Sequence, residues 1–149
     1  MSVNEAAAPG PDNGLHLVAF CCANSSAKAA ELAKAPFQLD AVTVRLVQLA
    51  CSSKIQVVHV LRALESGADG VALWTCPQDS CRFGRGCIRA AKRIERARRI
   101  LDQINVGAER VFLQALDPNE PDAVDKALSK AAQQLIELGK SPLKTVGVK

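Results

Sequence analysis

The segment LHLVAFCC, residues 15–22, has the composition of a buried β-strand and ends in two adjacent cysteines. Three more segments of the same kind follow along the chain: VTVRLVQLAC (residues 42–51), GVALWTC (70–76) and RVFLQAL (110–116). Strands that are apolar on both faces are typical of parallel sheets, in which helices cover each side. The opening segment and its three successors therefore predict a four-stranded parallel sheet.

Helical patterns separate the predicted strands. The first, at about 24–35, starts after good N-capping residues and stops at Pro36. The second begins at Ser52–Ser53 and ends at Gly67, a residue suited to a helix C-terminus. Helices that connect parallel strands are expected to cover the faces of the sheet.

Two further helices are expected, at about 85–104 and from about 119 to Gly139. In both, apolar residues recur every three or four positions. The predicted buried rows are Ile88, Ala91, Ile94, Ala97, Leu101 and Ile104 in the first, and Val124, Leu128, Ala131 and Leu135 in the second. This alternation of strands and helices predicts an α/β fold: a flavodoxin-like, doubly wound parallel sheet of about four strands in three layers, with strand order 2-1-3-4.

The chain of 149 residues is long enough for one domain with a core of its own. We expect a flexible N-terminal segment at residues 1–14, an α/β domain at 15–140 and a C-terminal tail at 141–149. The N-terminus lacks a basic end followed by an apolar run, and no segment is apolar enough to insert into a membrane. A cytoplasmic protein is expected, in which six cysteines indicate metal or redox chemistry rather than disulfides.

The cysteines cluster where the predicted strands end. Residues at the carboxyl ends of neighbouring parallel strands converge on one edge, so cysteines far apart in the sequence are brought together. The six are Cys21, Cys22, Cys51, Cys76, Cys81 and Cys87. In the plainest alternative, cysteine is only a small apolar residue of the core. The paired CxxC knuckles of structural zinc are absent, and so is the CxxC that a thioredoxin-type centre needs. Thiolate ligation of an iron–sulfur cluster is therefore favoured.

A basic run follows the third predicted strand. It contains one acid, Glu95, among the cations Arg82, Arg85, Arg89, Lys92, Arg93, Arg96, Arg98 and Arg99. Such a run can be a solvated helix face. Beside an anionic all-thiolate [2Fe–2S] cluster it would also make reduction easier. A third alternative is a binding module whose basic helix contacts nucleic acid or an acidic protein, with structural or zinc-bound cysteines.

The chain resembles the iron–sulfur (delta) subunit family of methyl-viologen-reducing hydrogenase over roughly residues 15–116. The similarity rests on AFCCANSS after the first strand, LACSSK after the second, RALESGADGV before the third, and WTCPQDSC followed by a glycine and a basic helix. It implies a [2Fe–2S] cluster held by Cys22, Cys51, Cys76 and Cys81. One position departs from the family pattern: Ser25 stands where the family has a second cysteine, and Cys21 and Cys87 are possible substitutes.

The resemblance also implies a function. Members are small electron carriers that dock on the heterodisulfide-reductase-A-like flavoprotein of larger redox complexes and on other iron–sulfur subunits. The sequence shows no Ser/His/Asp arrangement, Walker-type loop or dinucleotide-binding glycine motif of its own. We therefore expect a non-catalytic electron-transfer subunit of an oxidoreductase complex, with no nucleic-acid partner. A cluster-free scaffold within such a complex is the alternative that Ser25 suggests.

Overall fold

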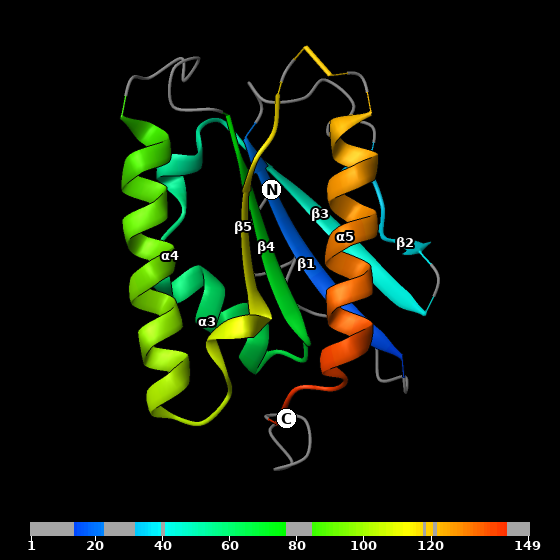
Figure 1. Cartoon of the computed structure of the whole chain (residues 1–149), viewed down its shortest axis with the longest axis vertical. Coiled ribbons are helices and arrows are strands. Elements are labelled where there is room, and N and C mark those ends of the chain that lie inside the picture. Colours follow the sequence, from blue (N-terminus) through cyan, green and yellow to red (C-terminus); the bar gives the residue numbers. More distant parts are fainter. Residues whose placement is uncertain are drawn as a thin grey trace.

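The computed structural model describes residues 14–22, 32–39, 41–76, 85–117, 119–120 and 122–142. These residues contain a five-stranded sheet with the order β2-β3-β1-β4-β5 (Figure 1). The strands are β1 (Leu15–Cys22), β2 (Phe37–Leu39), β3 (Val42–Leu49), β4 (Gly70–Thr75) and β5 (Val111–Ala115). All neighbours pair in parallel except β2 and β3. The α/β class and the order of the four parallel strands are confirmed.

The sheet is mixed rather than wholly parallel, because a short edge strand was not predicted. β2 runs antiparallel to β3, with Phe37 opposite Val44. The Thr43 hydroxyl donates a hydrogen bond to Gln38 Oε1 at 2.9 Å and links the two strands. A strand of three residues after Pro36 is too short to show a period of two, which is why the sequence pattern did not reveal it. Most of the predicted first helix, residues 24–31 of 24–35, lies outside the described residues.

Helices cover both faces of the sheet (Figure 1). Helices α3 (Val57–Glu65) and α4 (Gly86–Gln103) lie on one face, and α5 (Ala123–Leu138) lies on the other. Alternate residues of each strand point to opposite faces, so Val18 and Phe20 of β1 join the first core while Leu17 and Ala19 join the second. The predicted buried row of α5 is confirmed. Among the described helices, none has the length and hydropathy needed to cross a bilayer.

Two details differ from the sequence-based expectation. The segment after β3 first forms a 3₁₀ turn, η1 (Ser52–Lys54), and α3 begins only at Val57. In α4, the buried row starts at Cys87 and Ala90 rather than at Ile88 and Ala91. The observed and the predicted rows share Ile94, Ala97 and Leu101 and differ in the first turns of the helix. Both rows have helical spacing, and packing against the sheet decides which residues of the first turns are covered.

A buried polar network closes the amino end of the parallel strands. The Asp69 carboxylate accepts the backbone N–H of His16 at 2.8 Å and that of Ser141 at 2.7 Å. The Arg110 guanidinium donates to the carbonyl of Asp69 at 3.0 Å and to those of Gly139 and Lys140 at 2.9 Å. Burial lowers the pKa of Arg110, and the negative charges of Asp69 and Glu109 partly offset this effect. The network joins β1, β4, the start of β5 and the segment after α5.

Replacing Asp69 by Asn should destabilise the fold by about 3 kcal/mol, because a charged acceptor of two buried N–H groups is lost and Arg110 loses its counter-charge. Urea denaturation followed by circular dichroism measures the change. The matched control is Glu137→Gln on the exposed side of α5, which should alter stability by less than about 0.5 kcal/mol. Equal effects of the two substitutions would show that the network contributes little.

The start of α3 should make stability depend on pH. Neutral His59 accepts the backbone N–H of Gln56 at its Nδ1, at 3.0 Å, and burial together with the positive Arg62 lowers the pKa of His59. As the pH falls below about 6.5, the unfolded chain binds this proton before the folded chain does. Stability should therefore fall on acidification. The variant His59→Gln, which keeps a neutral capping group, should lose this component when melting temperatures are compared between pH 7.5 and pH 5.5.

Candidate metal centre

Three of the predicted ligands lie on adjacent strands at the carboxyl edge of the sheet. Cys22 is the last residue of β1, Cys76 directly follows β4, and Cys51 lies two residues beyond β3. Because β1 pairs with both β3 and β4, the three chain segments are neighbours. All three side chains are buried, Cys22 at 0%, Cys76 at 2% and Cys51 at 4% exposure. Helices α4 and α5 begin at this same edge, at the top of Figure 1.

The two adjacent cysteines of β1 face opposite ways. Cys21 belongs to the core beneath α5, together with Trp74, and its Sγ donates to the carbonyl of Cys22 at 3.6 Å. Cys22, one residue on, lies on the face covered by α3 and α4, since side chains alternate along a strand. The backbone at Cys51 is extended, and Cys51 lies two residues after Leu49, which belongs to the core on that same face. Cys22 and Cys51 are therefore assigned to the same side of the sheet.

The Cys51 sulfur has a defined hydrogen-bond donor. The Ser53 hydroxyl donates to Cys51 Sγ at 3.2 Å, and the backbone N–H of Lys54 donates to the Cys51 carbonyl at 2.9 Å. The 3₁₀ turn η1 produces both contacts, because it folds the chain back over the residue that precedes it. From the sequence, Ser52 and Ser53 were interpreted only as the start of a helix. The motif LACSSK contains the relevant clue, because it places two hydroxyl groups directly after a predicted ligand, Cys51.

Arg93 of α4 holds this turn in place. Its guanidinium Nη1 donates to the carbonyl of Ser53 and, at 3.0 Å, to that of Ile55. Ile55 is fully buried, so the turn is also anchored in the core below α4. Arg98 has a comparable structural role, donating twice to the carbonyl of Val111 at 2.8 and 3.2 Å. The carbonyls that these two arginines bind lie 13 to 40 residues away in the chain, so no local sequence pattern predicts these hydrogen bonds.

Cys87 also lies at this edge. It occupies the first turn of α4, is 8% exposed, and begins the buried row that continues through Ala90 and Ile94. The first turn of α4 contains no acidic residue, and the exposed Arg85 and Arg89 lie beside it. The partial positive charge of a helix N-terminus and these two cations all favour negative charge nearby. This end of α4 is therefore suited to thiolates or to an anionic group.

This edge contains a buried hydroxyl that makes no hydrogen bond within the described chain, as is also true of Arg110 Nε at the amino end. Ser52 is fully buried, and its Oγ has no hydrogen-bond partner within the described part of the chain. Burying an unpaired hydroxyl costs about 1–3 kcal/mol. Next to Cys51, a sulfur-containing anion would accept this hydrogen bond. The donor set and the unpaired hydroxyl therefore fit an iron–sulfur group in kind.

The fourth predicted ligand, Cys81, lies outside the described residues, as do Ser25 and Arg82. Within the ranges that the structure describes, no three Cys, His, Asp or Glu side chains are arranged to hold a metal ion. The five described cysteines form no disulfide with one another.

Comparison with known proteins identifies the family. The family model of the methyl-viologen-reducing hydrogenase delta subunit matches residues 17–139, and the chain belongs to this family. It is 30% identical, over 128 residues, to the vhu iron-sulfur D subunit of the F420-non-reducing hydrogenase of Methanocaldococcus jannaschii; the match covers 86% of this chain and 96% of that protein. The protein of the same name in Methanococcus maripaludis is 27% identical over 128 residues, with the same two shares.

A second kind of relative is much longer. The A subunit of the ferredoxin:CoB-CoM heterodisulfide reductase of Methanosarcina mazei is 28% identical to this chain over 123 residues, which are 83% of this chain and 16% of that protein. The domain thus occurs both as a small separate protein and as a region within a large one. The resemblance predicted from the cysteine motifs is confirmed.

Replacing Arg93 by Ala should loosen the turn that carries Cys51, since two carbonyl acceptors lose their donor, at a cost of about 2 kcal/mol. Cys51 should then react faster with iodoacetamide in the cluster-free protein, as measured by mass spectrometry of its peptide. The control is Arg89→Ala, which removes an exposed arginine one turn earlier in α4. An unchanged rate in Arg93→Ala, or an equal increase in both variants, would contradict the role assigned to Arg93.

Proposed function

We propose that this protein is the electron-transfer subunit of a larger oxidoreductase complex and that it carries one [2Fe–2S] cluster. The observation that supports this most directly is the burial of three thiols on three adjacent strand ends in a chain of this family. Thiolates gathered from separate strands suit such a cluster, which requires four sulfurs but no fixed knuckle. The cluster would supply one-electron chemistry that no side chain of this protein provides.

The proposed ligands are Cys22, Cys51, Cys76 and Cys81. Cys21 and Cys87 remain possible substitutes at the position that Ser25 leaves open. Of these two, Cys87 lies at the end of α4 that faces the edge, whereas Cys21 lies beneath α5. Under this proposal Ser53 and Ser52 donate hydrogen bonds to sulfur, and Arg93 holds the turn that presents them.

The charge at the site supports an electron-accepting role. Arg85 and Arg89 begin α4 without an acidic neighbour in its first turn. An all-thiolate cluster is an anion and becomes more negative on reduction, so positive charge at this edge favours the reduced state. Arg82 precedes Arg85 by three residues and would add to the same field.

The proposed partners are a heterodisulfide-reductase-A-like flavoprotein and further iron–sulfur proteins, in the cytoplasm. In the M. mazei relative, the region similar to this chain is covalently part of a heterodisulfide reductase protein. In the M. jannaschii relative, the domain is a separate iron-sulfur protein of a hydrogenase. A domain found in both contexts suits a role at the junction between two redox proteins.

Two alternative functions differ from the proposed one in that they predict a colourless protein. A cluster-free scaffold, suggested by Ser25, would itself add no cluster absorbance. A basic binding module with structural or zinc-bound cysteines would also be colourless and would bind generic DNA in a salt-sensitive manner. The cluster-carrying protein absorbs visible light and gives an electron paramagnetic resonance signal once it is reduced by one electron.

The neighbouring cysteines of β1 provide a matched pair of variants. Cys22→Ser should abolish the visible absorbance of the anaerobically purified protein and the signal of its reduced state. Cys21→Ser removes a sulfur from the opposite face of the sheet and should retain both, with iron and sulfide contents unchanged. If Cys21→Ser bleaches the protein and Cys22→Ser does not, the ligand assignment fails.

Ser53→Ala should lower the reduction potential of the bound cluster, since a hydrogen bond donated to a ligand sulfur stabilises the more negative, reduced form. The loss of one such bond corresponds to a shift on the order of tens of millivolts for a one-electron couple. A redox titration monitored by electron paramagnetic resonance measures it. Ser53→Thr keeps the hydroxyl and is the control. A raised or unaltered potential in Ser53→Ala would show that Ser53 does not act on the cluster through Cys51.

A further inference from the structure

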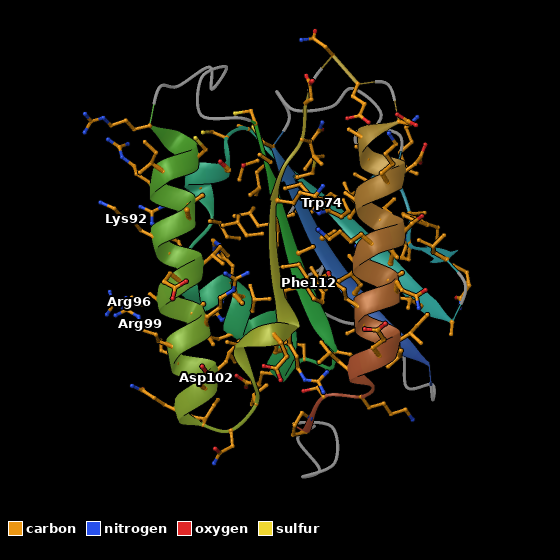
Figure 2. The ribbon with its side chains drawn as sticks, viewed as in Figure 1. Trp74, Lys92, Arg96, Arg99, Asp102 and Phe112 are labelled. Carbon is orange, nitrogen blue, oxygen red and sulfur yellow. The ribbon has the colours of Figure 1, made fainter. Side chains whose placement is uncertain are left out.

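The exposed cations of α4 form one stripe along the outer side of the helix. Five of them are spaced by four, three, four and three residues, which places them on one face of an α-helix. They are Arg85, Arg89, Lys92, Arg96 and Arg99. Figure 2 shows Lys92, Arg96 and Arg99 extending away from the sheet. The stripe is therefore separate from Arg93 and Arg98, which bind backbone carbonyls of their own chain.

These five charges are not neutralised by the part of the protein that the structure describes. None of them forms an ion pair with a described carboxylate, and Glu95, the acid within the stripe's length, lies 3.9 Å from Arg98 instead. Asp102 accepts the backbone N–H of Ala108 at 2.9 Å and so stabilises the turn after α4. Five adjacent like charges repel one another, and a partner of opposite charge would relieve that repulsion.

An apolar groove runs beside the stripe, between α3 and α4. Its volume is about 580 Å³, and it is lined by Gln56, Val57, Val58, Leu61, Lys92, Arg93, Arg96 and Ile100. Four of these residues are aliphatic, and one of them, Val58 in the first turn of α3, is 45% exposed although its side chain is apolar. Lys92 and Arg96 belong to both the stripe and the groove. The surface thus combines an apolar floor with a cationic wall.

We propose that the groove between α3 and α4 is the docking site for an acidic amphipathic segment of a partner protein. Its aliphatic side chains would contact Val58, Leu61 and Ile100, and its Asp or Glu side chains would pair with Lys92 and Arg96. Single-stranded nucleic acid is disfavoured because the groove contains no aromatic residue on which a base could stack, and the aliphatic lining of the groove has no counterpart on a duplex backbone. The inference rests on the proposed function in one respect, that this protein works within a complex.

The position of the groove connects it to the candidate metal centre. Arg93, which lines the groove, also holds the turn that follows Cys51. A partner seated between α3 and α4 would therefore contact the same helix that stabilises a proposed ligand of the cluster. Such a partner lies on the side of the sheet to which Cys22 and Cys51 are assigned, not on the side of α5.

The test uses the tagged full-length chain, expressed in its native host and purified anaerobically with its partners. In the double variant Lys92→Glu/Arg96→Glu, the amount of partner recovered per chain should fall at least tenfold, while the iron and sulfide content of the chain itself, measured after its separation from the partners, is unchanged. Val58→Arg, which fills the apolar floor, should reduce recovery as well. The control Lys130→Glu/Lys140→Glu makes the same change of charge at exposed residues of α5 and beyond, and should leave recovery intact.

A zero-length carbodiimide cross-link identifies the chemistry of the occupant, because it joins a lysine amine to a carboxylate in direct contact. In the unmodified complex, Lys92 should be linked to an Asp or Glu of the partner that lies between aliphatic residues. Full recovery in Lys92→Glu/Arg96→Glu would overturn the proposal, as would cross-links confined to Lys130 or nuclease-sensitive recovery of the partner. The two proposals fail separately. A chain that docks through Lys92 but contains no iron after its separation from the partners refutes only the cluster, and a cluster-containing chain that docks elsewhere refutes only this surface.

Discussion

The fold depends on the buried network of Asp69 and Arg110 at the amino end of the parallel strands. One carboxylate accepts N–H groups from β1 and from the segment after α5, and one guanidinium donates to the carbonyl just before β4 and to that same segment. Buried charges are costly unless they are hydrogen-bonded and offset by opposite charge. Here each group is hydrogen-bonded, and the negative charge of Asp69 favours the charged form of Arg110. The polar contacts at this end stabilise the fold from within the chain. The cysteines and the N-termini of α4 and α5 lie at the opposite end, where they are available to bind a cofactor or a partner.

The carboxyl edge is organised around sulfur. Ser53 donates to Cys51, Ser52 places an unpaired hydroxyl beside it, and Arg93 fixes the turn between them. Each end has one buried donor without an acceptor in the described chain, Arg110 Nε at the amino end and Ser52 Oγ at the carboxyl edge. The second of these lies next to Cys51, a proposed ligand, and this position supports the proposal that a group outside the polypeptide completes the edge.

The basic helix combines two functions that the composition alone cannot separate. Arg93 and Arg98 stabilise the structure, since each donates to carbonyls at the end of a neighbouring element. The outer stripe has no such partner in the described chain and borders an apolar groove. Some cations of this run thus bind the protein's own backbone, and the others are exposed to solvent. For this reason the sequence was compatible with three interpretations: a solvated face, an electrostatic role at the cluster and a binding surface.

The sequence by itself determined the four parallel strands and their order, because buried strands and amphipathic helices leave local periodic patterns: β1 and β4 have the predicted bounds. The motifs around Cys22, Cys51 and Cys76 also identified the family. Only the tertiary structure decided which row of α4 is covered, that Cys21 and Cys22 lie beneath different helices, and that Arg93 reaches back 40 residues to Ser53. These are contacts between segments distant in the chain, and they depend on how the layers pack, which no local period records.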